Sequence, residues 1–331
     1  MKKSFIIPAF IIILILTLLF TGMFFYPSFK KLLRTSEPNP GKTSVQEIKK
    51  DEKDRSTIAE LAKLKGRAAG SSYEKEAATV LARKFVDLDL EPMPNDKNFY
   101  FQTFKVPKRT TYRSGERLRF RGVGPAANPS QNVLGFLPGN SQDKVLIFTA
   151  HYDGQGINNN QVYESANDNL SGIYVLLNIA EALKSRLNRN ISYLFVAFGS
   201  EEIGLYGSEY FVHNLPIAKD SIIGVINCDT VSSEKENMLI EAFNKNQLVT
   251  EVEKALTNYN FSVRLDLSEL RTSDHYHFAS AGINALTIAA NDWLEGNHTP
   301  GDTYEKLNFD LLDQLSTALI DMALTMDELA N

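Results

Sequence analysis

Histidine and acidic residues follow the apolar, strand-like segments in the second half of this chain. In α/β sheets, ligand sites form beyond the carboxyl ends of the strands. We therefore expect the polar groups at these ends to converge on one cleft. They are His151 and Asp153 after 145–148, Asp168 where a helical pattern begins, Glu201 and Glu202 after 191–198, Asp229 after 222–227, and His298 beyond 285–290.

So many carboxylates in one cleft would repel one another, and their pKa values would rise sharply without cations. The sequence places no Lys or Arg beside these strand ends. Bound divalent metal ions would supply the missing positive charge, and imidazole with carboxylate suits zinc. Two Zn²⁺ ions balance three ligand carboxylates and one hydroxide. This charge balance favours two metal ions over one without proving it.

Each of these residues could instead have a purely structural role. His151 and Asp153 could lie in a surface turn, and Asp168 could cap the helix that follows it. Glu201 and Glu202 could be a solvated acidic pair. We expect structural roles for two of the other three histidines, His213 and His277. The ordered combination, rather than any one motif, indicates a site.

The elements that must position these groups alternate between strands and helices. Beyond the strands named above, we expect strands at 99–106, 118–121, 131–136, 238–242 and 261–267. We expect helices at 72–90, 170–187, 206–213, 247–259 and 309–329. This alternation predicts an α/β fold with a doubly wound, largely parallel sheet, a mixed edge and helices on both faces.

Composition sets broader limits on the function. The chain has 331 residues, a net charge of −5 and a hydrophobic fraction of 43%, which is ordinary for a globular protein with a core. No basic stripe appears outside the first fifty residues, which argues against a nucleic acid partner. The single cysteine, Cys228, excludes an intramolecular disulfide but fixes no compartment.

The N-terminus indicates membrane attachment. Residues 4–25 are uncharged and about long enough to span a bilayer as one helix. We expect a transmembrane signal anchor at 1–27, a polar stalk at 28–55 and the catalytic domain at 56–331, outside the cytoplasm. The alternative is a cleaved signal peptide, but the apolar stretch is long for one and no small-residue cleavage site follows it.

Six segments, in this order, resemble the co-catalytic (two-zinc) aminopeptidases, a family of zinc exopeptidases that includes glutaminyl cyclases and transferrin-receptor-like proteins. They are FTAHYD, ANDNLSG, AFGSEEIGLYGS, NCDTV, TSDHYHFASAGINALTI and NHTPGDT. The resemblance covers residues 56–331. It implies that His151 and Asp229 bind one zinc, Glu202 and His298 the other, and that Asp168 bridges them. It further implies Glu201 as general base, Asp153 as the group orienting His151, and a supporting role for Ser273, Asp274 and His275.

The resemblance implies hydrolysis of the N-terminal peptide bond of peptides with a free N-terminus, by a metal-activated water. Two alternatives stay open. One is a glutaminyl-cyclase-like acyltransferase with a single zinc, and the other is a non-catalytic binding module on the same fold. Neither the preferred N-terminal residue nor the oligomeric state follows from the sequence.

Overall fold

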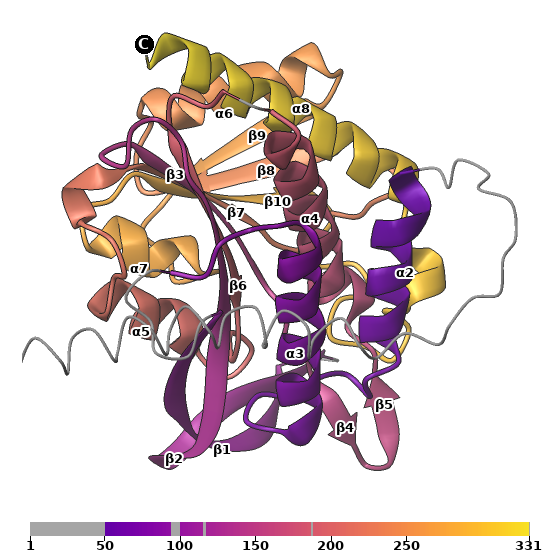
Figure 1. Ribbon diagram of the computed structural model, residues 1–331. Helices are drawn as coiled ribbons and strands as arrows, with labels where there is room; N and C mark the ends of the chain where they lie inside the picture. The colour runs from indigo at the N-terminus through magenta and orange to yellow at the C-terminus, as the bar shows by residue number, and fades with distance from the viewer. Residues whose placement is uncertain (1–49, 94–99, 115–116, 187, 331) are drawn as a thin grey trace, which may run out of the picture. The chain divides into compact units, whose positions relative to one another are not determined.

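The computed structural model describes residues 50–93, 100–114, 117–186 and 188–330 (Figure 1). The expected anchor, 1–27, and most of the expected stalk lie outside these residues. Among the helices that are described, none combines the length and the apolar composition needed to cross a membrane. The first described helix, α2, begins at Lys50, within the segment expected as stalk.

An eight-stranded mixed sheet forms the centre of the described part of the chain, in the order β1-β2-β6-β3-β7-β10-β8-β9. Its inner strands β6, β3, β7 and β10 run parallel, as do β8 and β9, whereas the pairs β1–β2, β2–β6 and β10–β8 are antiparallel. The predicted α/β class with a mostly parallel sheet is confirmed. The strands are β1 (Phe101–Ser114), β2 (Arg117–Leu137), β3 (Val145–His151), β6 (Ser192–Phe198), β7 (Ile222–Cys228), β8 (Asn237–Ala242), β9 (Ser262–Leu267) and β10 (Ala285–Ala290).

Helices pack against both faces of this sheet. Figure 1 shows α5 and α7 on one side of the sheet and α4 and α8 on the other, and α4 contacts α8, β3 and β7. A separate two-stranded ribbon consists of β4 (Gly156–Asn158) and β5 (Gln161–Tyr163). The helices are α2 (Lys50–Ala62), α3 (Ser72–Asp87), α4 (Ser171–Lys184), α5 (Tyr206–His213), α6 (Gln247–Asn258), α7 (His275–Ser280) and α8 (Phe309–Leu329).

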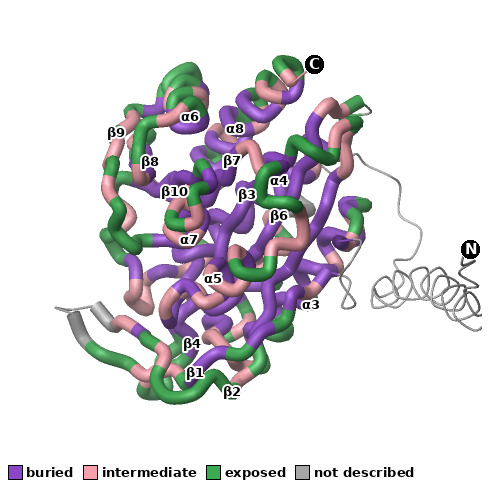
Figure 2. Tube along the Cα trace, turned by 90° about the vertical axis from the view of Figure 1, so that its left-hand side faces the viewer, coloured by how far each residue is buried: buried purple, intermediate pink, exposed green. Residues whose placement is uncertain are grey.

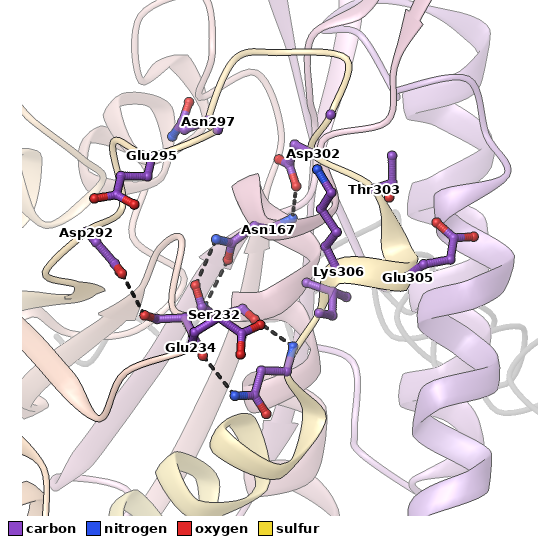
Figure 3. A pocket seen from close by; sticks show the side chains of 15 residues that line it. Asn167, Ser232, Glu234, Asp292, Glu295, Asn297, Asp302, Thr303, Glu305 and Lys306 are labelled. Carbon is purple, nitrogen blue, oxygen red and sulfur yellow. Dashed lines mark hydrogen bonds between the residues drawn. The ribbon is translucent and has the colours of Figure 1, made fainter.

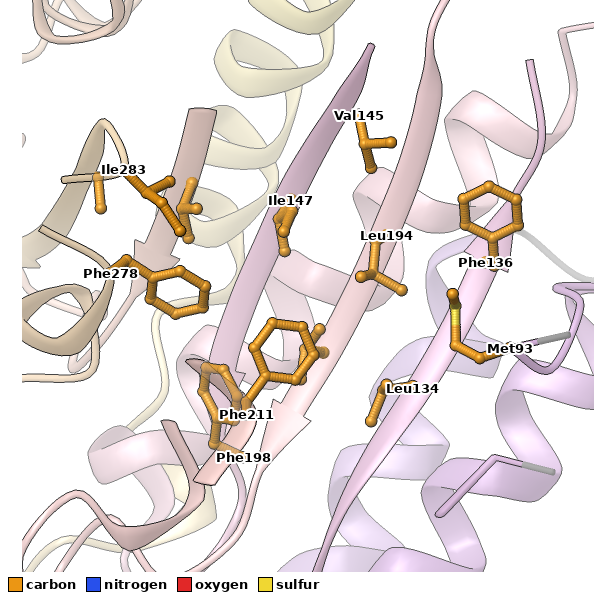
Figure 4. Close-up of a cluster of buried hydrophobic side chains, with 13 residues drawn as sticks. Met93, Leu134, Phe136, Val145, Ile147, Leu194, Phe198, Phe211, Phe278 and Ile283 are labelled. Carbon is orange, nitrogen blue, oxygen red and sulfur yellow. The ribbon is translucent and has the colours of Figure 1, made fainter. Parts of the chain in front are cut away.

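The inner strands are mostly apolar because both of their faces are covered. Every residue of β3 and β6 is buried, and Figure 2 shows these strands in purple. On the α5 and α7 face, the rings of Phe198, Phe211 and Phe278 lie 5.7–6.1 Å apart (Figure 4). Strands covered on both faces lack polar alternation, which explains why the sequence predicted them well.

The region before β3 differs from the expectation. Three short strands were expected at 99–106, 118–121 and 131–136, but the structure joins them into one long antiparallel hairpin, β1–β2. Its outer half, from Lys108↔Val123 to Ser114↔Arg117, is rich in polar and charged residues and shows little apolar alternation. The sequence therefore gives only the short strand signal at 118–121 there, although the backbone hydrogen bonds continue on both sides of it.

The parallel register brings the strand ends together. His151 at the end of β3 pairs with Phe198 at the end of β6, and Ile288 of β10 pairs with Cys228 at the end of β7. The residues that follow these strands therefore start from one edge of the sheet. This arrangement confirms the convergence predicted from the sequence.

Candidate metal centre

Six of the predicted groups lie within a few ångströms of one another. His151 Nε2 is 3.1 Å from Asp168 Oδ1 and 3.4 Å from Asp229 Oδ1. His298 Nε2 is 3.1 Å from Asp168 Oδ2 and 3.4 Å from Glu202 Oε2. Two triads could each hold an ion, because their candidate ligand atoms lie within 4.8 Å of one another: His151, Glu201 and Asp229, and Asp168, Glu202 and His298.

Asp168 lies between the two histidines, in an irregular turn, Ala166–Leu170, that leads into α4. The carboxylate of Asp302 sets this turn, because its oxygens accept hydrogen bonds from the backbone N–H groups of Asn167 at 2.6 Å and Asp168 at 3.1 Å. The side-chain oxygen of Asn169 accepts the backbone N–H of Gly172 in the first turn of α4 at 2.9 Å, so Asn169 caps this helix in place of Asp168. The two carboxylate oxygens of Asp168 instead face His151 and His298, one each.

Asp153 shapes the turn that carries the acidic pair. Its Oδ1 accepts a hydrogen bond from the backbone N–H of Glu201 at 2.9 Å, and its Oδ2 accepts one from Glu202 at 3.3 Å. The Nδ1 atom of His151 lies 3.2 Å from the main-chain oxygen of Asp153 and 3.6 Å from its carboxylate. Asp153 therefore contacts both the strand end and the acidic pair.

Asp229 is held by the segment after β9. Its Oδ2 accepts a hydrogen bond from the Ser273 hydroxyl at 2.5 Å, and Asn227 in turn donates to Ser273 at 2.8 Å. Burial raises the pKa of neighbouring Asp274 to about 7. His275 contacts the Thr287 hydroxyl instead of the cluster. Of the three residues expected to support the site, Ser273 makes the direct contact.

The electrostatics of the cluster follow from burial and from the neighbouring charges. Burial and the carboxylates of Asp229 and Asp274 raise the pKa of Glu201 well above the usual range. Burial and Asp168 do the same to the pKa of Glu202. Asp168 differs, because its close approach to the rings of His151 and His298 outweighs the effect of burial and lowers its pKa. The expected rise therefore applies to the acidic pair but not to Asp168.

The His151 ring tests whether the cluster suits a metal ion. His151 is fully buried, and its Nε2 atom makes no hydrogen bond with any polar atom in the described part of the chain, although two carboxylates lie within 3.4 Å. Such a nitrogen, beside carboxylate oxygens and without hydrogen-bond geometry toward them, fits coordination of a cation between them. Two histidines with four carboxylates form a donor set that suits zinc.

The sequence indicated no cationic side chain near the strand ends, and this prediction was wrong. Arg67 is completely buried between the end of β3 and the turn that carries Asp168. Its guanidinium donates hydrogen bonds to the main-chain oxygens of Tyr152 at 2.7 Å, Glu164 at 2.9 Å and Ser165 at 2.7 Å. Burial lowers its pKa to about 10, so it stays charged at neutral pH. It lies 85 residues from Tyr152 in sequence, and no local pattern indicates this contact.

Replacing Arg67 with methionine is expected to lower the free energy of unfolding by about 3 kcal/mol, because three buried carbonyl oxygens lose their donor. Arg67→Lys should not restore it, since one ammonium cannot span the three acceptors. Urea denaturation measures the effect, with Arg83→Met as the control, because Arg83 pairs with Glu60 at the surface. A loss below about 1 kcal/mol would contradict the prediction.

Glu74 contacts the residue that precedes the acidic pair Glu201 and Glu202. The sequence analysis assigned no role to Glu74. Its carboxylate accepts hydrogen bonds from the Gly70 N–H at 2.7 Å and from the hydroxyls of Ser130 and Ser200, both at 2.9 Å. Ser200 directly precedes Glu201 and has a φ of +59°. Burial, followed by the charge of Asp153, raises the pKa of Glu74 from 4.5 to about 8.

This pKa implies a pH-dependent stability. The folded protein holds the Glu74 proton more tightly than the unfolded chain, so the stabilisation is complete below pH 4.5 and is lost as the pH rises to about 8. The slope is at most about 1.4 kcal/mol per pH unit. Glu74→Gln should remove this slope, as urea denaturation between pH 5 and 8 would show. Parallel pH curves for both proteins would refute it, and exposed Glu60→Gln is the control.

A cavity of about 330 Å³ opens onto the cluster. Asp168, Glu201, Glu202, Asp229 and His298 line it, together with residues from the β1–β2 hairpin and from the segment after β9. A larger cavity of about 580 Å³ also has Asn297 in its lining (Figure 3). None of the six residues of the two triads lines this larger cavity. In Figure 3, Asp302 and Asn167 line that cavity, and Asn167 belongs to the turn that carries Asp168. The smaller cavity is therefore the one with access to the cluster.

A family model described as "Peptidase family M28" matches residues 132–323. The chain belongs to peptidase family M28. The match includes all seven predicted site residues, and it confirms the predicted membership of the zinc exopeptidases. At the level of that family, it also confirms the metallopeptidase class and zinc as the cofactor.

Two further similarities agree with this M28 assignment. Aminopeptidase YwaD of Bacillus subtilis is 30% identical over 201 residues, which is 56% of this chain and 42% of that protein. The chain thus spans less than half the length of this relative. The structure of a zinc aminopeptidase from Bacillus subtilis aligns with a TM-score of 0.67 at 20% identity, over 85% of this chain and 96% of that one.

Glutaminyl cyclases share the fold as well. The enzyme from Porphyromonas gingivalis aligns with a TM-score of 0.63 at 17% identity, over 85% of this chain and all of that one. At such identities, the likeness concerns the fold alone. The choice between peptidase and cyclase within the M28 architecture therefore depends on the site itself.

Proposed function

We propose that this M28 protein is a two-zinc aminopeptidase that hydrolyses the N-terminal peptide bond of peptides. The observation that carries the proposal is the position of Asp168, whose two oxygens each lie 3.1 Å from a different histidine. A carboxylate placed in this way can bridge two ions. We assign His151 and Asp229 to one ion, Glu202 and His298 to the other, and Asp168 to both.

Glu201 is the proposed general base. Its carboxylate lies within 4.8 Å of the ligand atoms of His151 and Asp229, so it can reach a water molecule held between them. When bound, two Zn²⁺ ions would polarise the scissile carbonyl and acidify a water molecule. Glu201 accepts a proton from the attacking water and returns it to the leaving amine nitrogen. Asp153 positions Glu201 by accepting its backbone N–H.

The proposed restriction to the N-terminus follows from the charge of the cavity. Four carboxylates line it, from Asp168, Glu201, Glu202 and Asp229. Such an environment binds a free α-amino group better than any other part of the peptide main chain. Every peptide with an unblocked N-terminus carries this group, which is either a cation or a nitrogen that can bind a metal ion. Blocked or internal peptide bonds lack this group.

Enzyme assays with the zinc-loaded full chain test the proposal. We expect hydrolysis of aminoacyl p-nitroanilides and no hydrolysis of their N-acetylated forms, with two zinc ions per chain by metal analysis. Cyclisation of an N-terminal glutamine peptide with one zinc per chain would instead support the cyclase alternative. Zinc binding without turnover of either substrate would support a binding module.

We further propose that residues 4–25 anchor the enzyme in a membrane, within a 1–27 segment, and that 28–55 connects this anchor to the catalytic domain at 56–331. The support is the uncharged apolar stretch in the sequence. Cells expressing the full chain should retain it in the membrane fraction after a carbonate wash. Release of the protein into the soluble fraction would contradict anchoring, and protease protection of the domain in intact cells would contradict its proposed location outside.

A further inference from the structure

Three arginines line the same cavity as the proposed metal ligands. Arg119 and Arg121 come from β2, and Arg271 comes from the segment between β9 and α7. Residues two apart on a strand share a face, so the two hairpin arginines stand together. The three arginines that line the cavity therefore come from two segments of the chain, which are about 150 residues apart in the sequence.

Contacts with aromatic rings and a main-chain oxygen hold two of these arginines in position. None of these contacts supplies a negative charge. Arg121 stacks over the Tyr112 ring, with 5.6 Å from its guanidinium carbon to the ring centroid. Arg271 donates a hydrogen bond to the main-chain oxygen of Gly204 and lies 5.8 Å from the Tyr276 ring centroid. Among the ion pairs between described residues, none involves Arg119, Arg121 or Arg271.

The charge of the cavity therefore depends on the metal ions of the proposed function. Two Zn²⁺ ions cancel the four carboxylates that line the cavity, from Asp168, Glu201, Glu202 and Asp229. The three guanidinium groups remain as positive charge. A cavity of about 330 Å³ is at the small end of the range for small-molecule sites, about 300–1000 Å³, so the residues that follow the scissile bond remain close to this charge.

We propose that these arginines recognise a carboxylate on the leaving portion of the substrate, a preference that rests on the proposed function. Guanidinium groups form the strongest hydrogen-bonded pairs with carboxylates. The carboxylate can be the C-terminus of a short peptide or an acidic side chain just after the scissile bond. The α-amino nitrogen binds at the metal-holding cluster, and the arginines bind the other end of the substrate.

Two matched pairs of substrates test the preference and separate the two sources. Leu-Gly-Gly is compared with Leu-Gly-Gly-amide, and Leu-Asp-Gly-amide with Leu-Asn-Gly-amide. We expect kcat/KM to be about tenfold higher for the anionic member of at least one pair, mainly through KM, and the ratio to shrink with added salt. Ratios within twofold for both pairs would overturn the proposal, as would a preference confined to N-terminal Asp or Glu.

Variants locate the effect. Arg121→Gln and Arg271→Gln should each reduce the preference severalfold while leaving kcat/KM for the uncharged members nearly unchanged. Arg83→Gln is the matched control, because its guanidinium pairs with Glu60 on the surface. An undiminished preference in the double variant Arg121→Gln, Arg271→Gln would overturn the assignment to these residues.

A binding measurement keeps the test independent of turnover. The single tryptophan of the chain, Trp293, lines this cavity, so its fluorescence reports occupancy. In the zinc-loaded full chain with Glu201→Gln, Leu-Gly-Gly or Leu-Asp-Gly-amide should bind about tenfold more tightly than its uncharged counterpart. Equal binding in both pairs would refute the arginine site. Hydrolysis of none of the four peptides by the unmodified chain would instead refute the aminopeptidase proposal.

Discussion

Replacing Glu201 with glutamine is expected to lower kcat on aminoacyl p-nitroanilides by about 10²–10⁴-fold, the usual contribution of a general base. Glutamine has nearly the same shape but cannot accept the proton of the attacking water. The backbone N–H of residue 201 would still donate to Asp153, so the turn should persist. KM and the zinc content should therefore change little. Steady-state kinetics with metal analysis of the same preparation measure all three quantities.

Two further variants make the result specific. Glu201→Asp keeps a carboxylate but withdraws it by one methylene, so activity should fall between that of the unmodified chain and that of Glu201→Gln. Glu209→Gln, on α5, is the control for loss of an acid outside the cavity, and it should retain activity. Full activity in Glu201→Gln would remove Glu201 from the proposed mechanism. Loss of zinc from that variant would show that Glu201 binds metal instead.

The positions of these groups were predictable because buried parallel strands leave a clear signal in the sequence. The seven residues of β3 and the seven of β6 are all buried, and most of them are apolar, so the sequence shows two apolar runs that end beside the polar groups of the site. The rule that sites form at the carboxyl ends of such strands then predicted the meeting of His151, Asp229 and the acidic pair. Structure adds the distances and the central position of Asp168.

The supporting residues were not predictable in the same way. Arg67, Glu74 and Asp302 each act on segments 56–135 residues away, through contacts that no local pattern encodes. Asp302 even lies in the quoted segment NHTPGDT, yet its role requires the geometry of the turn that carries Asp168. Apart from 118–121, the outer half of the β1–β2 hairpin was not predicted, because its pairing depends on backbone hydrogen bonds and involves few apolar side chains.

These supporting contacts also explain how the cluster is kept in place. Most of its hydrogen bonds come from backbone N–H groups or from hydroxyls, as at Asp153, Asp302 and Ser273. They orient the acidic groups, so that oxygens of Asp168 and Glu202 face the histidines. Carboxylates that lie this close together attract protons as well as metal ions. A metal ion therefore displaces the protons only if it carries enough positive charge.

Replacing Asp168 with alanine is expected to lower the zinc content of the chain from two ions and to reduce kcat/KM by at least about 10³-fold. The metal ions contribute several kcal/mol to the transition state, and each 1.4 kcal/mol is a factor of ten. The two oxygens of Asp168 approach His151 and His298, so its loss affects both ions. Metal analysis after dialysis, together with kinetics, measures the effect, and circular dichroism checks that the fold is retained.

The comparison with Glu202→Ala decides between a bridged pair and two independent sites. Glu202 pairs with His298 at 3.4 Å, so its removal should release one zinc and leave the other at His151 and Asp229. A bridged pair requires the Asp168 variant to hold less zinc than the Glu202 variant. Equal zinc contents would contradict the bridge. One zinc in the unmodified chain, unaffected by Glu202→Ala, would favour the cyclase chemistry, because the second triad would then have no ion to hold.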